Sequence, residues 1–270
     1  MVAGIPSNQQ NERVRDALAV QFRVIAALVL RETRAAYGTS QLGYLWEIIT
    51  PAAGTAILVA IFTAIGRHPP FGSSFALFFA TGLLTLFLFR KFASSLMGVY
   101  DANKALMTYP PIKGTDVLYA RSLLIAATQL VITVLFYSGL GAWNLAGFPA
   151  YPEKLIEAFA VTALLGFGFG ATNAVLVSYF ESWRQVVTIL MRPLIFISAI
   201  FYVPSYMPPE VVDWLKWNPV LHCVEWMRNG YYANYDSQVL DQSYVLTVAV
   251  LLTLTGLLGE RLTRQQRGGA

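Results

Sequence analysis

One uninterrupted apolar stretch limits the folds that are open to this chain. The run from Ala158 to Phe180 holds 23 residues without a charged side chain, and a helix of that length can cross the hydrocarbon core of a bilayer. Of the 270 residues, 56% are hydrophobic and only 13% are charged, so a single soluble domain would have too little polar surface to cover itself. The sequence therefore predicts an all-α integral membrane protein.

Further apolar runs predict six transmembrane helices within one transmembrane domain over residues 38–260. Their expected bounds are residues 46–65, 75–99, 117–140, 155–180, 186–203 and 244–259. The first of these helices can accept Pro51 only within its first turns, because proline lacks a backbone N–H. For the same reason we expect Pro193 to kink the fifth helix.

The segment before the first span is expected to be an amphipathic helix. Residues 1–12 are expected to be a disordered cytoplasmic terminus without a cleaved signal peptide. Apolar side chains then recur at helical spacing at Leu18, Phe22, Ile25 and Val29. Arg15, Arg23 and Glu32 interrupt this pattern, which favours a helix over residues 13–37 lying in the membrane interface. A short first transmembrane helix is the alternative, but a central arginine is costly in lipid.

Residues 204–243 are neither a span nor a plain loop, because they are rich in aromatic side chains. The aromatic residues are Trp214, Trp217, Trp226, Tyr231 and Tyr232. We expect two short, half-buried helices that form a re-entrant hairpin at the outer membrane surface, between spans five and six.

The distribution of Lys and Arg predicts the orientation. The side that holds the N-terminus, the segment between spans two and three and a basic, disordered tail over residues 261–270 carries 15 of the 19 basic residues, and the other side carries four. The positive-inside rule then places both termini in the cytoplasm. The net charge of +4 fits this topology signal better than it fits nucleic-acid binding.

A polar, basic segment separates the second and third spans, from Asp101 to Asp116. Its first half predicts one short helix over residues 102–108, since Asp101 can cap the free N–H groups and Pro110 and Pro111 forbid continuation. We expect a partner outside the membrane to bind this segment.

The residues that carry chemistry are few. One cysteine, Cys223, excludes an intramolecular disulfide, and His68 and His222 without further cysteines leave no zinc site. His222 and Glu225 stand at i, i+3 and would be the acid/base groups of a membrane enzyme acting on lipid-linked glycans. The alternative is a structural pairing of Glu225 with His222 or Arg228.

A transport function needs a cavity and a source of energy. The sequence has no Walker lysine motif, so ATP would have to be hydrolysed by a separate motor. Ion-driven transport is disfavoured but not excluded, because the apolar cores hold no clearly placed acidic residue. The pair Gly166 and Gly170 is a GxxxG motif, which favours close helix packing over phosphate binding.

Aromatic and arginine side chains suggest where a charged glycan would pass, since aromatic faces stack on sugar rings and arginines bind carboxylates and phosphates. The candidates for the substrate entrance or path are Arg31, Arg34, Tyr37, Trp46, Arg90, Arg192, Tyr202, Trp214, Trp217 and Trp226. An aromatic and basic belt that only anchors the protein is the alternative. Arg90 is expected to snorkel or to face a wet cavity, and Arg192 to have a buried partner or a water-filled cavity.

Three motifs resemble one family. They are LGYLWEIITP from Leu42, YDANKALMTYPPIKGTDVLYARSLL from Tyr100, and RPLIFISAIFYVPSYMP from Arg192 followed by WNPVLHCVEWMRN. Together they resemble the permease subunit of capsular polysaccharide exporters of Gram-negative bacteria, the KpsM-like group of the ABC-2 exporters. O-antigen and teichoic-acid exporters share this architecture and stay open as alternatives.

The resemblance implies a homodimeric, non-catalytic permease of the inner membrane, with no cofactor of its own, paired with two ATPase subunits that bind ATP and Mg. It implies an ABC-2 permease fold and a coupling element that docks into the ATPase. The coupling residues would be Asn103, Lys104, Leu106, Met107, Tyr109 and Pro110. It further implies an acidic, lipid-linked capsular polysaccharide as substrate, and as partners a periplasmic co-polymerase and an outer-membrane export protein.

Overall fold

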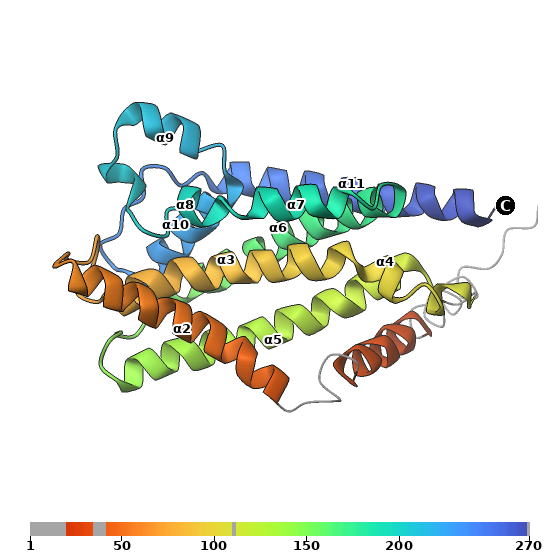
Figure 1. Cartoon of the computed structure of the whole chain (residues 1–270), viewed down its shortest axis with the longest axis horizontal. Coiled ribbons are helices and arrows are strands. Elements are labelled where there is room, and N and C mark those ends of the chain that lie inside the picture. Colours follow the sequence, from red (N-terminus) through yellow and green to blue (C-terminus); the bar gives the residue numbers. More distant parts are fainter. Residues whose placement is uncertain (1–19, 35–41, 110–111, 269–270) are drawn as a thin grey trace, which may run out of the picture.

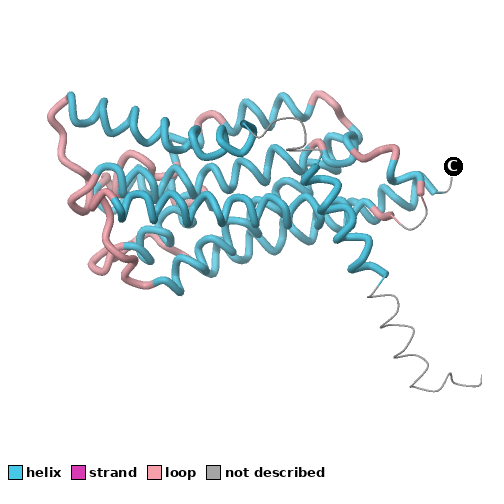
Figure 2. The backbone as a smooth tube through the Cα atoms, turned by 90° about the horizontal axis from the view of Figure 1, so that it is seen from below, coloured by secondary structure: helices cyan, strands magenta, loops and turns pink. Residues whose placement is uncertain are grey.

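A computed structural model of the chain describes residues 20–34, 42–109 and 112–268, and every regular element in these ranges is a helix (Figure 1). The expected all-α class is therefore confirmed for this part of the chain. The helices run side by side along one long axis, and most of the loops gather at the two ends of the bundle (Figure 2).

The helices follow one another in a simple order. After a helix over residues 20–34 come α2 (Leu42–Ala64), α3 (Phe75–Met97), α4 (Val99–Ala102), η1 (Leu106–Thr108), α5 (Gly114–Ala142), α6 (Pro152–Tyr179), α7 (Trp183–Met191), α8 (Leu194–Ile197), η2 (Pro204–Tyr206), α9 (Pro209–Leu215), α10 (Pro219–Tyr231) and α11 (Gln242–Gly268). Five of them are long and apolar enough to cross a membrane, namely α2, α3, α5, α6 and α11.

The expected fifth span is not one helix. Residues 186–203 belong to α7, to α8 and to the turns that follow, and the break falls at Arg192 and Pro193. Proline has no N–H to donate and its ring crowds the preceding turn, so α7 ends with the Arg192 N–H donating to the Ile189 carbonyl at 3.2 Å. The expected kink is thus a full interruption of the helix.

Two other expectations need correction. Pro51 does not lie in the first turns, because α2 already begins at Leu42 and includes Pro51 in its interior. The Thr50 hydroxyl, next to the proline, donates to the Trp46 carbonyl at 2.8 Å. At the other end of the chain, α11 continues to Gly268, so most of the expected disordered tail over residues 261–270 is helical.

The core lies where α6 packs between α3 and α11. A Cβ atom added at Gly166 would lie 2.7 Å from Phe92 Cβ of α3, and one added at Gly168 would lie 2.6 Å from the Thr253 backbone nitrogen of α11. Since real Cβ atoms do not approach so closely, these helices can meet only at glycine. The predicted close packing at the glycine motif is confirmed.

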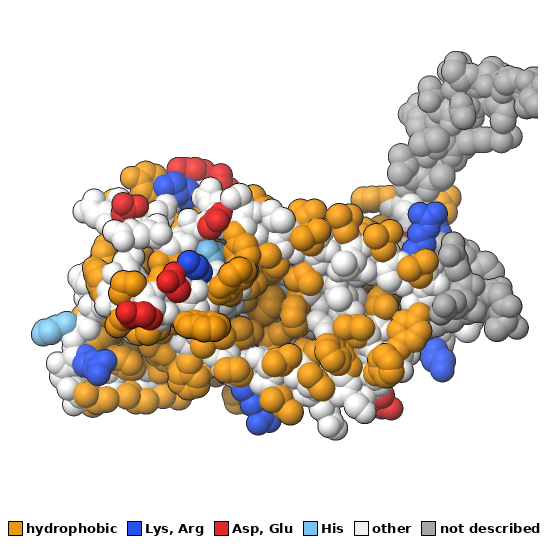
Figure 3. Space-filling model, turned by 90° about the horizontal axis from the view of Figure 1, so that it is seen from above, with side chains coloured by type: hydrophobic (Ala, Val, Ile, Leu, Met, Phe, Trp, Pro, Cys, Tyr) orange, Lys and Arg blue, Asp and Glu red, His pale blue; other side chains and the backbone are white. Residues whose placement is uncertain are grey.

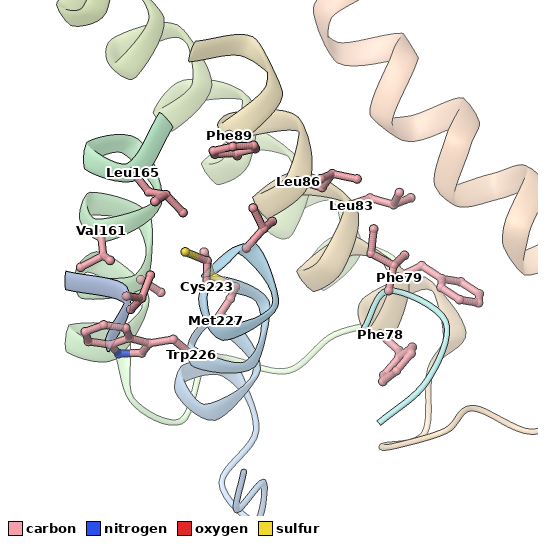
Figure 4. Packing of buried hydrophobic residues seen from close by; sticks show 14 of the residues in the cluster. Phe78, Phe79, Leu83, Leu86, Phe89, Val161, Leu165, Cys223, Trp226 and Met227 are labelled. Atoms are coloured by element: carbon pink, nitrogen blue, oxygen red, sulfur yellow. The ribbon is translucent and has the colours of Figure 1, made fainter. Parts of the chain in front are cut away.

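The helix α10 closes this core at the end of the bundle near α9. Figure 4 shows its side chains Cys223, Trp226 and Met227 packed with residues of α3 and α6. α3, which packs against both α6 and α10, is the most buried of the five candidate spans, with 78% of its apolar window buried. The packing of α3, α6 and α10 therefore forms the core that positions the candidate site residues.

Candidate functional site

The polar segment between α3 and α5 does not form the single expected helix. It consists of α4, a turn and the short 3₁₀ helix η1. Asp101 lies inside α4 and does not cap a helix over residues 102–108; instead its Oδ2 accepts a hydrogen bond from Arg184 Nη2 at 2.9 Å. The reason is that α4 starts at Val99, directly after Gly98, so Asp101 is already inside the helix.

This segment, residues 99–109, is bound to the helix over residues 20–34. Arg31 Nη1 donates to Asn103 Oδ1 at 2.5 Å, and Asn103 Nδ2 donates to the Val99 carbonyl at 3.0 Å. Asn103 is only 2% exposed, so its side chain holds the segment together and is not free to contact a partner.

Two polar contacts attach the same N-terminal helix to α5. Arg121 forms an ion pair with the nearly buried Glu32, and Gln21 donates to Asp116. Leu28 of the same helix is buried, whereas Phe22 is 75% exposed. The helix 20–34 and the segment 99–109 therefore form one packed unit at the end of the bundle that also holds the C-terminus (Figure 1).

The outer side of segment 99–109 is hollowed. A cavity of about 500 Å³ is lined by Tyr100, Asp101, Lys104, Met107, Thr108 and Ser178. Among the expected coupling residues, Lys104 and Tyr109 are exposed, Leu106 and Met107 are half-buried, and Pro110 lies outside the described residues. Lys104 and Tyr109 are therefore the members of the set that a docking protein can reach.

Arg90 of α3 is shared by two open cavities on the flanks of α3. The first, called here the α3–α7 cavity, measures about 440 Å³ and includes Arg90 and Arg192. The second, the α2–α3 cavity, measures about 330 Å³ and includes Arg90 and Trp46. The structure thus brings three of the expected path residues together, with Arg90 between the other two.

Of the four entrance candidates, only Trp46 is part of this arrangement. Arg31 instead contacts Asn103 and Glu32. Arg34 is exposed at the end of its helix. Tyr37 lies outside the described residues.

Sequence reasoning missed an ion pair beside this site. Glu47 of α2 accepts a hydrogen bond from Lys91 of α3, and its second oxygen lies 3.5 Å from Gln129 Nε2 of α5. The signal was present in the sequence, since Glu47 is an acidic residue inside an apolar stretch. Such a residue nearly always has a partner within the bundle.

The aromatic residues expected at the far end divide into two groups. Trp214 and Trp217 are 81% and 69% exposed, but Trp226 is 4% exposed. The expectation that Trp226 lies on the outer surface is therefore wrong, because α10 is enclosed by α3 and α6. Tyr202 is half-buried, and a cavity of about 1000 Å³ includes Trp217 and His222.

His222 and Glu225 do not form an acid/base pair. His222 Nδ1 accepts the Asp241 backbone N–H at 3.0 Å, so its Nε2 carries the proton and donates to the Lys216 carbonyl at 2.8 Å. The ring is 1% exposed and both of its nitrogens are occupied. It is therefore a structural histidine.

Glu225 belongs instead to a buried network, as one of the two structural alternatives predicted. It pairs with Arg228 at 3.3 Å and accepts hydrogen bonds from Tyr235 at 2.8 Å and Ser237 at 2.6 Å. Burial raises the pKa of Tyr235, so this hydroxyl remains a donor. Nearby, hydrogen bonds from Ser243 and from the Tyr244 N–H lower the pKa of the exposed Asp241. Among the residues that the structure describes, no group of three or more His, Cys, Asp or Glu is placed to hold a metal.

Three named relatives align with most of this chain. It is 31% identical over 245 residues to the "Polysialic acid transport protein KpsM" of Escherichia coli, covering 90% of this chain and 94% of that protein. It is 25% identical to the "Capsule polysaccharide export inner-membrane protein CtrC" of Neisseria meningitidis, covering 90% and 91%. It is 24% identical to the "Capsule polysaccharide export inner-membrane protein BexB" of Haemophilus influenzae, covering 90% and 92%.

The profile of one protein family, "ABC-2 type transporter", matches residues 23–232. This range includes the segment 99–109, both cavities beside Arg90 and the buried pair of Glu225 with Arg228. Together with the relatives, the match shows that the chain belongs to the ABC-2 type transporter family.

Proposed function

We propose that this chain is the transmembrane permease subunit of an ATP-driven exporter that moves capsular polysaccharide across the Gram-negative inner membrane. The observation that carries the proposal is the alignment of 90% of the chain with proteins named for polysialic acid transport and capsule polysaccharide export. The engaged ring of His222 and the pairing of Glu225 with Arg228 argue against an enzyme built on those two residues.

The exported polymer, in this proposal, is acidic and travels on a lipid terminus. The arginines at Arg90 and Arg192 support this, because both line a cavity on the flank of α3 and guanidinium groups bind carboxylates and phosphates. The exposed rings of Trp214 and Trp217 at the other end offer faces on which sugar rings can stack.

The motor is a pair of separate ATPase subunits that bind ATP and Mg, acting on two copies of this chain. Segment 99–109 is the coupling element, with Lys104 and Tyr109 as its exposed contacts and the adjoining cavity as the place for an ATPase side chain. Since Arg31 and Asn103 join this segment to the helix 20–34, a push on one would move the other.

The membrane topology completes the proposal. The helix 20–34 lies in the cytoplasmic interface, where the exposed Phe22 and Leu30 meet lipid. The segment α7–α8 makes the sixth crossing despite its break, and α9 with α10 forms a hairpin that re-enters from the periplasmic side. There the polymer would pass to a periplasmic co-polymerase and an outer-membrane export protein.

Copurification tests the coupling element. When tagged full-length chain is extracted gently from its native membrane, a vanadate-sensitive ATPase should accompany it at equal stoichiometry. Replacing residues 103–109 by a Gly-Ser linker should remove the ATPase, because it removes Lys104 and Tyr109 together with the rim of the cavity.

A matched replacement of residues 66–74, the turn at the opposite end of α3, serves as the control and should leave the ATPase bound. Recovery of the intact wild-type protein without any ATPase would contradict the exporter. Equal retention of the ATPase by both linker variants would contradict only the role of segment 99–109.

A further inference from the structure

The α3–α7 cavity is open to the surface and has an unusual lining for an apolar bundle. Its walls are Arg90, Ala93, Ser94, Met97, Val187, Thr188, Met191, Arg192 and Ile195. Two of these nine residues are permanently cationic and none is acidic. The Ser94 and Thr188 hydroxyls donate to carbonyls of their own helices, Arg90 and Arg184 respectively, so the arginines are the groups left to bind a ligand.

Arg90 is only partly satisfied within the protein. Its Nη2 donates to the Met191 carbonyl, which the break before Pro193 leaves at the end of α7. Its Nε is buried and has no hydrogen-bond partner within the part of the chain described here. A buried N–H of a charged group that lacks an acceptor is costly, and an anion would remove that cost.

The neighbouring Lys91 has an acidic partner, whereas Arg90 and Arg192 do not. Lys91, the next residue of α3, is neutralised by Glu47 on the side of the α2–α3 cavity. For Arg90 and Arg192, by contrast, no carboxylate lies within ion-pair distance among the described residues. Arg90 is half-buried and Arg192 is exposed at the cavity. Unpaired cations within the apolar part of a membrane protein are costly and mark ligand or ion pathways.

The position of Glu47 also decides which of the two cavities an anion would enter. In the α2–α3 cavity the Glu47 carboxylate occupies Lys91 and leaves Arg90 as the unpaired cation of that lining, while the α3–α7 cavity has two guanidinium groups and no opposing charge. Phosphate matches guanidinium forks better than it matches a single point charge. The remaining walls of the α3–α7 cavity, including Ala93, Val187 and Ile195, are apolar and suit an acyl or prenyl chain.

We propose that the α3–α7 cavity binds the phosphate-bearing headgroup of a lipid, with Arg90 and Arg192 on the phosphate and the apolar wall on the chain. The inference deepens the proposed function, on which it rests, by giving the lipid terminus of the polymer a binding site. The break in the helix serves this arrangement, since it places Arg192 beside the cavity and leaves the Met191 carbonyl to accept the hydrogen bond from Arg90.

Binding of a defined lipid to the full-length chain tests the site without requiring export. The chain is purified in a neutral detergent and titrated with dioctanoyl phosphatidylglycerol, and occupancy is counted by native mass spectrometry. The double variant Arg90→Gln with Arg192→Gln should bind about 100-fold more weakly, which corresponds to about tenfold for each arginine. Glutamine removes both charges but keeps a polar side chain at each position.

The matched control is Arg67→Gln with Lys216→Gln, which removes the same charge from exposed positions away from the cavity and should bind like the wild type. The variant Arg90→Lys with Arg192→Lys keeps the charge and guards against misfolding; it should bind between the wild type and the glutamine variant. An equal loss of lipid affinity in the control would overturn the site, because the lipid would then be attracted by the net charge of the protein and not by these two arginines.

Two further probes separate the possible sources of the phosphate. Inorganic pyrophosphate alone should bind more weakly than the lipid, and dioctanoylglycerol, which has no phosphate, should not bind at these residues. Pyrophosphate binding as tightly as the lipid would overturn the role of the apolar wall. A wild-type chain that restores capsule to an export-deficient strain yet binds no probe would overturn the site and leave the proposed function intact.

Discussion

Arg228 shows how a charge is accommodated in the core of this protein. Its side chain is fully buried, and its guanidinium carbon lies 3.9 Å from the centre of the Phe78 ring. One nitrogen contacts Glu225 and the Tyr202 carbonyl, and another donates to the Ile200 carbonyl at 3.3 Å. The arginine therefore joins α10 to the residues that follow α8, and it does so only because its charge is paired.

Removing one partner of this pair should be strongly destabilising. In Arg228→Met the Glu225 carboxylate stays buried without its cation, so we expect a loss of about 3–5 kcal/mol of unfolding free energy. Denaturant titration of the purified protein in detergent measures it. The exposed pair of Lys216 with Asp213 is the control, and Lys216→Met should change stability little.

The companion change Glu225→Met in the same molecule should recover part of the loss, because no charge is then left unpaired. A double variant as unstable as Arg228→Met alone would show that packing around the guanidinium, and not its charge, is what the core requires.

At this scale the sequence narrowed the partner of Glu225 to His222 or Arg228, but it did not predict that Trp226 is buried. Both candidates stand three positions from Glu225 on the helix, so local geometry alone could not decide between them. Whether a tryptophan faces solvent or core depends on which elements surround its helix. Residues 204–243 give no hint that α3 and α6 enclose α10.

Among the elements, α6 depends most on small side chains. Besides Gly166 and Gly168, Gly170 packs against α3, where an added Cβ would lie 2.8 Å from Leu96 Cβ, and Gly256 of α11 packs against α6, 2.8 Å from Ala171 Cβ. The regular spacing of small residues is a local property, and for that reason the close packing was predictable from sequence.

A methyl group at Gly168 should therefore separate α6 from α11. Gly168→Ala places its Cβ against backbone atoms of α11, which cannot rotate away, and we expect a loss of about 1–3 kcal/mol from such overpacking. Gly139 of α5 has nothing within 4 Å of an added Cβ, so Gly139→Ala should leave stability unchanged or raise it by up to about 1 kcal/mol through helix propensity. Thermal unfolding in detergent compares the two, and equal effects would argue against backbone contact as the cause.

The break between α7 and α8 and the subdivision of segment 99–109 could not be predicted in the same way. A proline predicts that one backbone hydrogen bond of the helix is missing. Whether the helix then bends or stops depends on which other groups form hydrogen bonds with the backbone at that point. Here Arg90 of α3 supplies the donor to the Met191 carbonyl. Likewise, the turn around Asn103 is fixed by Arg31, which is 72 positions away in sequence.

At the scale of the whole molecule, the contacts of α7–α8 show whether this segment extends from one end of the bundle to the other. Arg184 at the start of α7 is paired with Asp101 of α4, whereas the Ile197 and Ile200 carbonyls after the break bond to Asn218 and Arg228 at the end near α9. The segment thus runs from one end to the other, as the five long helices do. The helix 20–34 and the C-terminus accordingly lie at the same end (Figure 1).

The surface agrees with a lipid-facing bundle. In the space-filling view, the middle of the visible face is largely hydrophobic and most acidic side chains lie near the end that carries α9 (Figure 3). Long helices that turn apolar side chains outward, such as Leu123 and Val134 of α5 and Leu251 of α11, need an apolar solvent.

The number of crossings and their orientation can be measured by cysteine labelling, because the native Cys223 is fully buried and leaves little background. We predict that His68→Cys, in the turn before α3, reacts with a membrane-impermeant maleimide in intact spheroplasts, while Tyr109→Cys reacts only after the membrane is permeabilised. Both native residues are exposed, so a lack of reaction reports the membrane and not burial. Arg261→Cys, near the far end of α11, distinguishes the topologies. If α7–α8 crosses the membrane, Arg261→Cys is protected like Tyr109→Cys; if only the five long helices cross, it reacts from outside like His68→Cys.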